Sequence, residues 1–119
     1  AMYASAKGLD NLVAVVDNNN LQIDGTVSSV NSPYPIPEKF KAFGWNVIEI
    51  CGNNFDEIDA AFNAAKSFKG KPTAIIAKTV KGKGVSFMED SCDWHGVAPN
   101  AEQYEAAMAE LDEELAKLE

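Results

Sequence analysis

Arginine is absent from the sequence, so all ten basic residues are lysines, and there is one histidine, His95. An anion bound by this chain therefore meets lysine, backbone N–H, His95 or a metal, and never a bidentate guanidinium group. The two cysteines, Cys51 and Cys92, form no CxxC or Cys/His pair. Their spacing argues against a zinc site and a disulfide framework, and we expect a reduced, cytoplasmic protein.

Long hydrophobic runs are also missing. The longest ones, Leu12–Val16 and Ala74–Ala77, are far shorter than the roughly 20 residues needed to cross a bilayer, so we expect no membrane partner. The net charge is −8, which makes nucleic acid an unsuitable partner. The acids are concentrated in residues 101–119, while residues 66–83 carry six lysines and no acid.

The hydrophobic pattern alternates between strand and helix signals, which predicts an α/β fold with a parallel sheet and flanking helices. Leu12–Val16 is a continuous apolar run typical of a strand buried on both faces. Residues 26–36 have a loop composition, and Met2–Lys7 fits either a helix end closed by Gly8 or a frayed terminus. The other expected strands are 46–50 and 73–80, and the helices begin at Pro37 and after the cap residues Asn54 and Asn100.

Ligands of parallel α/β sheets bind beyond the carboxyl ends of the strands, which here are followed by Asp17–Gly25, Cys51–Phe55 and Lys81–Gly96. In the first segment, the side-chain oxygen of Asn19 and the backbone carbonyl of Leu21 have the spacing of two neighbouring ligands for a hard cation such as Mg²⁺. The alternative is a turn capped by asparagine side chains, with no metal.

Two further features suggest anion binding. The glycines of Lys81-Gly82-Lys83-Gly84 permit close backbone approach and the lysines favour anions, although the segment matches neither a P-loop nor a dinucleotide fingerprint. A surface loop without a ligand is the alternative. His95 has the chemistry to bind phosphate or to move a proton near neutral pH, and a purely structural histidine is the alternative.

Three segments together resemble the thiamine-diphosphate-binding domain of transketolases. They are LVAVVDNNNLQIDG, AIIAKTVKGKGVSFMED and Trp94-His95-Gly96, in the order and spacing of that family. The resemblance runs from about Leu9 to the end of the sequence. It implies a transferase that moves a two-carbon ketol unit from a ketose phosphate to an aldose phosphate in the pentose phosphate pathway, with thiamine diphosphate and Mg²⁺ or Ca²⁺ as cofactors.

The resemblance also implies roles for individual residues. Asn19 matches the asparagine whose side chain binds the metal, and Leu21 matches the residue that gives its backbone carbonyl to the same metal. Ile23 matches an apolar contact near the cofactor rings, and Lys81 a residue that lines the cofactor pocket. His95 matches a histidine near the diphosphate and the donor sugar that assists proton transfer.

The sequence departs from the family in several respects, since the family's early catalytic histidines and its pyrimidine-binding domain have no counterpart in it. The family's metal-binding Gly-Asp-Gly motif does not occur in it. We therefore expect residues 1–119 to be a partial, incomplete thiamine-diphosphate-binding domain, inactive alone and paired with a transketolase C-terminal subunit that carries the pyrimidine-binding domain. An open sheet edge also predicts homo-oligomers. The alternatives are a non-catalytic remnant or interaction domain, and a small phosphosugar-binding α/β domain.

Overall fold

The computed structural model describes residues 1–118, and the chain divides into two compact units. The first unit comprises Ala1–Asn18 and Ser32–Thr79. The second comprises Asn19–Asn31 and the described residues from Val80 onward. None of the helices in this described part has the length and apolarity needed to cross a membrane.

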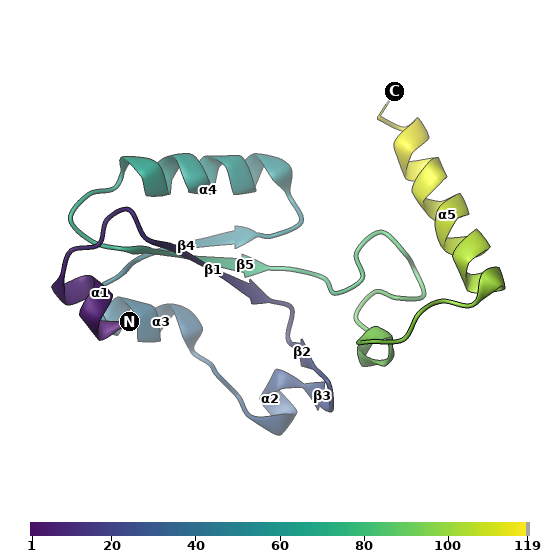
Figure 1. Ribbon diagram of the computed structural model, residues 1–119, viewed down its shortest axis with the longest axis horizontal. Coiled ribbons are helices and arrows are strands. Elements are labelled where there is room, and N and C mark those ends of the chain that lie inside the picture. Colours follow the sequence, from purple (N-terminus) through teal and green to yellow (C-terminus); the bar gives the residue numbers. More distant parts are fainter. Residues whose placement is uncertain (119) are drawn as a thin grey trace. The chain divides into compact units, whose positions relative to one another are not determined.

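A three-stranded parallel sheet forms the centre of the first unit. Its strands are β1 (Val13–Asn18), β4 (Asn46–Cys51) and β5 (Thr73–Lys78), in the order β1-β5-β4. In register, Ile75 of β5 lies between Val15 of β1 and Ile48 of β4. The predicted α/β fold with a parallel sheet is confirmed, and Figure 1 shows the three arrows pointing the same way.

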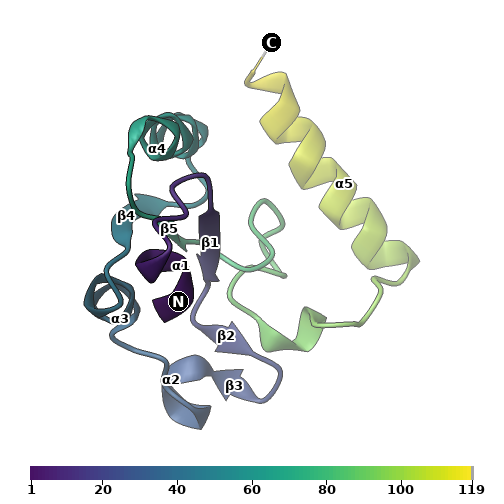
Figure 2. The same cartoon turned by 60° about the vertical axis from the view of Figure 1, so that its left-hand side comes forward.

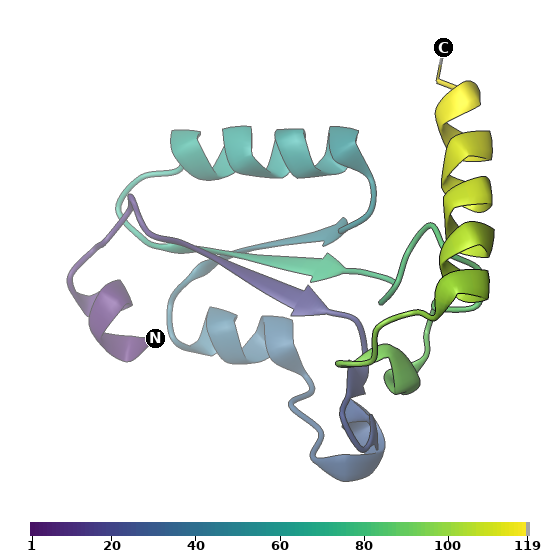
Figure 3. The ribbon, with the colours of Figure 1, turned by 45° about the vertical axis from the view of Figure 1, so that its right-hand side comes forward.

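Helices cover both faces of this sheet, as Figure 3 shows for α4 (Phe55–Ser67) on one face and α3 (Ile36–Ala42) on the other. The short helix α1 (Met2–Ala6) lies on the same side as α3. The core on that side joins Ala4 to Trp45 and Ile76. Of the two alternatives for residues 2–7, the helix is therefore correct, and it ends before Gly8, whose φ is +60°.

The prediction that Leu12–Val16 is buried on both faces is wrong. The strand runs over Val13–Asn18 and has a sheet neighbour on one side only among the described residues, so Val15 remains 54% exposed. The fully buried central strand is β5, in which Thr73–Ala77 are all at most 6% exposed. Strand order, which periodicity does not encode, decides which apolar run lies in the centre. The third strand also ends at Lys78 rather than at Val80.

The predicted helix caps are largely confirmed. The Asn54 side chain accepts hydrogen bonds from the backbone N–H groups of Asp56 and Glu57 at the start of α4. At the start of α5 (Ala101–Ala116), Asn100 and Gln103 form a reciprocal capping box. In α3, Pro35 is the cap residue, so Pro37 is the second helical residue instead of the first.

The second unit contains little regular structure before α5. The strands β2 (Leu21–Gln22) and β3 (Gly25–Thr26) form a small antiparallel hairpin, visible in Figure 2. A single-turn helix, α2 (Val27–Val30), follows because the Thr26 hydroxyl caps the N–H of Ser29. The prediction of a plain loop over 26–36 is thus wrong in its first part. A 3₁₀ turn, η1 (Cys92–Trp94), precedes α5.

Candidate functional site

One pocket of the second unit is lined by Asn19, Leu21, Gln22, Ile23, Lys81 and His95. Its volume is about 350 Å³. All five residues assigned a role from the sequence line it, together with Gln22, which was not predicted. None of the six lining residues is acidic. The pocket joins the segment after β1 to the segment after β5, whereas Cys51–Phe55 belongs to the first unit.

The Asn19 side chain shapes the first wall of the pocket. Its Oδ1 accepts a hydrogen bond from the N–H of Leu21 at 2.8 Å, and Asn20 takes a left-handed conformation with φ of 60°. The N–H of Val27 donates to the carbonyl of Asn20 at 2.9 Å and closes the hairpin. The Asn-capped turn is therefore present, but it does not exclude a ligand role, because an amide oxygen has a second lone pair.

Lys81 begins a loop that is closed on itself by hydrogen bonds. Its carbonyl accepts from the N–H of Asp90 at 3.0 Å. Gly82 has a φ of +73°, and a Cβ there would overlap the backbone carbonyl of Met88. The glycine thus permits close approach of the chain to itself, where the sequence suggested close approach to a ligand.

His95 follows the 3₁₀ turn η1 and is exposed at the pocket. Its backbone N–H donates to the carbonyl of Cys92 at 3.0 Å. The neighbouring Trp94 is fixed by a hydrogen bond from Nε1 to the carbonyl of Phe87 at 3.0 Å and by a ring contact with Phe87, with centroids 5.3 Å apart. These contacts hold the residue that directly precedes His95.

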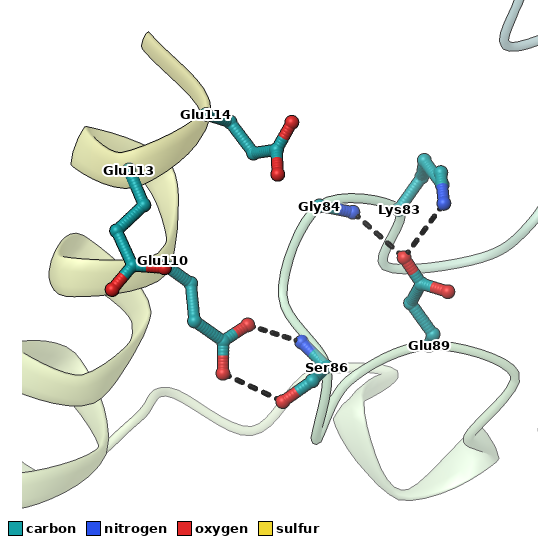
Figure 4. A pocket seen from close by; sticks show the side chains of 7 residues that line it. All are labelled: Lys83, Gly84, Ser86, Glu89, Glu110, Glu113 and Glu114. Carbon is teal, nitrogen blue, oxygen red and sulfur yellow. Dashed lines mark hydrogen bonds and ion pairs between the residues drawn. The ribbon is translucent and has the colours of Figure 1, made fainter. Parts of the chain in front are cut away.

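A second pocket of about 460 Å³ is lined by Lys83 and by four glutamates, so its charge is negative. The glutamates are Glu89, Glu110, Glu113 and Glu114. Lys83 Nζ donates to Glu89 Oε1 at 3.1 Å, and the N–H of Gly84 donates to the same oxygen at 3.1 Å. Figure 4 shows Glu110 reaching from α5 to the hydroxyl and N–H of Ser86. The hydrogen bond from the Gly84 N–H, then the one from Lys83, lowers the pKa of Glu89.

A metal finds only part of a coordination shell in the first pocket. Asn19 and Leu21 offer two neutral oxygens, and the described residues contain no group of three or more His, Cys, Asp or Glu side chains that could hold a metal ion. Lys81 and His95 are donors suited to an anion. The residues thus fit a phosphate-bearing cofactor, and they fit a divalent ion only if the anion and other protein groups supply further ligands.

The fold is thus a parallel α/β sheet, and the second unit adds a pocket lined by donors that suit an anion. Over residues 1–115 the chain matches the family described as "Transketolase, thiamine diphosphate binding domain". The chain belongs to this transketolase family.

The curated relatives are longer proteins. The chain is 44% identical over its whole length to an apulose-4-phosphate transketolase subunit of Phocaeicola vulgatus, and covers 42% of it. It is also 44% identical to the 6-deoxy-6-sulfo-D-fructose transketolase subunit SqwG of Clostridium sp., with 96% of the chain aligned to 42% of that protein. The chain therefore spans about two fifths of the length of these relatives.

Solved transketolase structures share the fold. In the Pichia stipitis enzyme in complex with sedoheptulose 7-phosphate, 93% of this chain aligns with 16% of that chain at 26% identity, with a TM-score of 0.84. The Campylobacter jejuni transketolase aligns with 98% of this chain and 22% of its own at 28% identity, with a TM-score of 0.74. The recognition of the family from three sequence segments is confirmed.

Proposed function

We propose that this chain is part of the thiamine-diphosphate-binding subunit of a transketolase. In the complete assembly, that enzyme moves a two-carbon ketol unit from a ketose phosphate to an aldose phosphate. The observation that carries the proposal is the pocket of the second unit. It brings Asn19, Leu21, Ile23, Lys81 and His95 together from two segments far apart in the sequence.

Each of these residues has a task that its chemistry supports. Asn19 Oδ1 and the Leu21 carbonyl would hold Mg²⁺ or Ca²⁺, and the apolar Ile23 side chain, 66% exposed, would contact the cofactor rings. Lys81 balances diphosphate charge. The His95 imidazole binds phosphate or holds a proton for the donor sugar. Bound thiamine diphosphate supplies the carbon chemistry of the transfer.

The chain needs a partner for this activity. Two neutral oxygens are a weak hold on a divalent ion, which prefers about six oxygen ligands. The relatives named as transketolase subunits suggest that the partner is a second, C-terminal subunit, which carries the pyrimidine-binding domain. We therefore expect the chain alone to bind the cofactor weakly or not at all, and to be inactive.

The alternative of a small phosphosugar-binding domain built on the Lys81–Gly84 loop has less support. Lys83 is paired with Glu89 and lies in the acidic pocket, so only Lys81 of the two lysines meets the anion-binding pocket. That alternative predicts sugar phosphate binding without a metal. A non-catalytic interaction domain predicts no ligand at all.

Calorimetric titration separates these functions. Thiamine diphosphate is added with and without Mg²⁺ to the chain alone and to the chain mixed with a transketolase C-terminal subunit. We expect Mg²⁺-dependent binding in the mixture, at least tenfold weaker in Asn19→Ala, since a tenfold change needs only about 1.4 kcal/mol. Ribose 5-phosphate serves as the metal-free comparison. Metal-independent binding, or none in the mixture, contradicts the proposal.

A further inference from the structure

The helix α5 carries a row of large apolar side chains that remain partly exposed. They follow one another at intervals of four, three and four residues, the spacing that places side chains in one row along a helix. The members of this apolar row are Tyr104, Met108, Leu111 and Leu115, and their exposed fractions are 52%, 37%, 42% and 56%. Single exposed apolar residues are common on proteins, whereas a contiguous row of them is typical of a surface that binds another molecule.

Contacts with the preceding loop hold α5 in place beside this row. The N–H and the hydroxyl of Ser86 donate to the carboxylate of Glu110 (Figure 4). Ala107, one turn earlier, is only 8% exposed. Leu111 borders the same loop, since a Cβ added at Gly84 would lie 3.5 Å from its Cδ2. The helix is thus anchored through the face that carries Ala107 and Glu110, and the apolar row next to that face keeps its exposure.

Both edges of the apolar row are acidic. With the row at the a and d positions of a heptad, Glu105 and Asp112 occupy e positions and Glu114 occupies a g position. The helix has six acidic residues and no basic one. Two copies of α5 side by side would bring carboxylates against carboxylates, so the edges disfavour a second copy of this helix. Lysine or arginine at the corresponding positions of a facing helix would form ion pairs with them.

Within residues 1–118, no other helix has this complementary pattern. The helices α1, α2 and α3 have seven residues or fewer. The longer helix α4 buries Ala61 and Ala65 and carries three acids and one lysine. We propose that the apolar row of α5 binds an amphipathic helix of a different protein, in which lysine or arginine flanks the apolar side. This inference goes beyond the proposed function and does not depend on a bound cofactor.

A synthetic peptide of known pattern tests the surface directly. The probe has three heptads, about 21 residues, with leucine at the a and d positions and lysine at the e and g positions. Calorimetry measures its binding to the chain, and we expect binding that weakens as salt is added, because exposed charge pairs are screened. Two reference peptides carry glutamate at e and g, or serine at a and d. Each should bind about tenfold more weakly than the probe.

Substitutions in α5 show where the probe binds. Leu115→Gln removes an apolar member of the row and should weaken binding about tenfold. Its control is Ala109→Gln, because Ala109 is an exposed residue of the same helix outside the row, and this change should leave the affinity unchanged. The double variant Glu105→Lys with Asp112→Lys reverses the charge of one edge, so it should prefer the glutamate peptide to the lysine probe. Hydrogen exchange of the peptide-free variants reports whether α5 stays folded.

Several results would overturn the proposal. They are no binding of the probe, equal binding by the wild type and Leu115→Gln, and equal binding of the lysine and glutamate peptides to the wild type. If Leu115→Gln turns a self-associating chain into a monomer in light scattering, a second copy covers the row and the proposal is also wrong. If α5 unfolds in Leu115→Gln, the preference of the charge-reversed variant decides. Thiamine diphosphate binding should be unchanged in all these variants, so the two proposals fail independently.

Discussion

The stability of the helix α5 depends more on the capping box at its N-terminus than on packing, and a substitution of Asn100 tests this. Of the described residues of α5, only Ala107 is buried, while Leu111 and Leu115 are 42% and 56% exposed. Isolated helices of this length are marginal in water, so the capping box carries an unusual share of the stability. Asn100→Ala removes the side-chain oxygen that accepts from the N–H of Gln103 at 2.9 Å.

The expected magnitude follows from the chemistry of the cap. Loss of an asparagine cap costs about 1 kcal/mol, which corresponds to about a fivefold increase in the opening equilibrium of the helix. Native-state hydrogen exchange measures this directly, because each amide reports its local opening free energy. We expect amides of α5 to exchange about fivefold faster in Asn100→Ala, with no change at Ile75 in the central strand β5.

Asn54→Ala is the matched control, since Asn54 caps α4 through the N–H groups of Asp56 and Glu57. There the helix packs on the sheet through the buried Ala61 and Ala65. We therefore expect faster exchange in the first unit and none of the α5 response. Equal acceleration of α5 and β5 in Asn100→Ala refutes a local opening of α5, and no acceleration refutes the importance of the cap.

Three further predictions concern other parts of the chain. The hydrogen bond from the Ser86 hydroxyl, and then the one from its N–H, lowers the pKa of Glu110. This contact therefore stabilises the protein at pH values above the pKa of Glu110 in the unfolded chain, and the stabilisation is lost as the pH falls through the lower pKa of the folded protein. The NMR signal of the Ser86 amide should shift on acidification in the wild type and remain unchanged in Glu110→Gln. Gly82→Ala, measured by urea denaturation, should cost more than the roughly 1–2 kcal/mol of a left-handed residue, because its Cβ also meets backbone. Gly70→Ala is the comparison, since Gly70 has a φ of +85° but a Cβ added there would meet nothing within 4 Å. Equal losses of unfolding free energy in the two variants would contradict the close approach of Gly82 to the Met88 backbone. The chain should self-associate in light scattering through the open edge of β1, and Val15→Lys should shift it toward the monomer, whereas a wild-type monomer at all concentrations would count against this.

The sequence predicts where helices and strands lie along the chain better than it predicts which strands are neighbours in the sheet. Asn54 and Asn100 mark helix starts correctly because a cap is a local hydrogen-bonding event within four residues. The exposed edge position of Val15 was not predictable, because it depends on β5 crossing to the centre of the sheet. The single-turn helix after Thr26 was missed because one hydroxyl contact decides it within a polar segment.

The candidate site was likewise predictable only in part, because some of its features depend on the three-dimensional structure. Asn19 directly follows β1 and His95 lies in the long segment between β5 and α5, and both line the pocket. Gln22 has no unusual signal, since its unpaired Nε2 is a property of three-dimensional burial alone. Lys83 looked equivalent to Lys81 in sequence, but Glu89 pairs with Lys83 and removes it from the anion-binding group.

The location of the pocket also predicts how a ligand acts on stability. The buried apolar residues described in the first unit include Ile36, Trp45 and Ile75, while the second unit contributes only Ala107. The pocket is therefore built in the unit held mainly by turns, caps and carboxylate contacts. A ligand that binds only the folded pocket adds stability that grows with the logarithm of its concentration. We infer that cofactor binding slows hydrogen exchange in the hairpin and in α5 first, and leaves the central strand β5 almost unchanged.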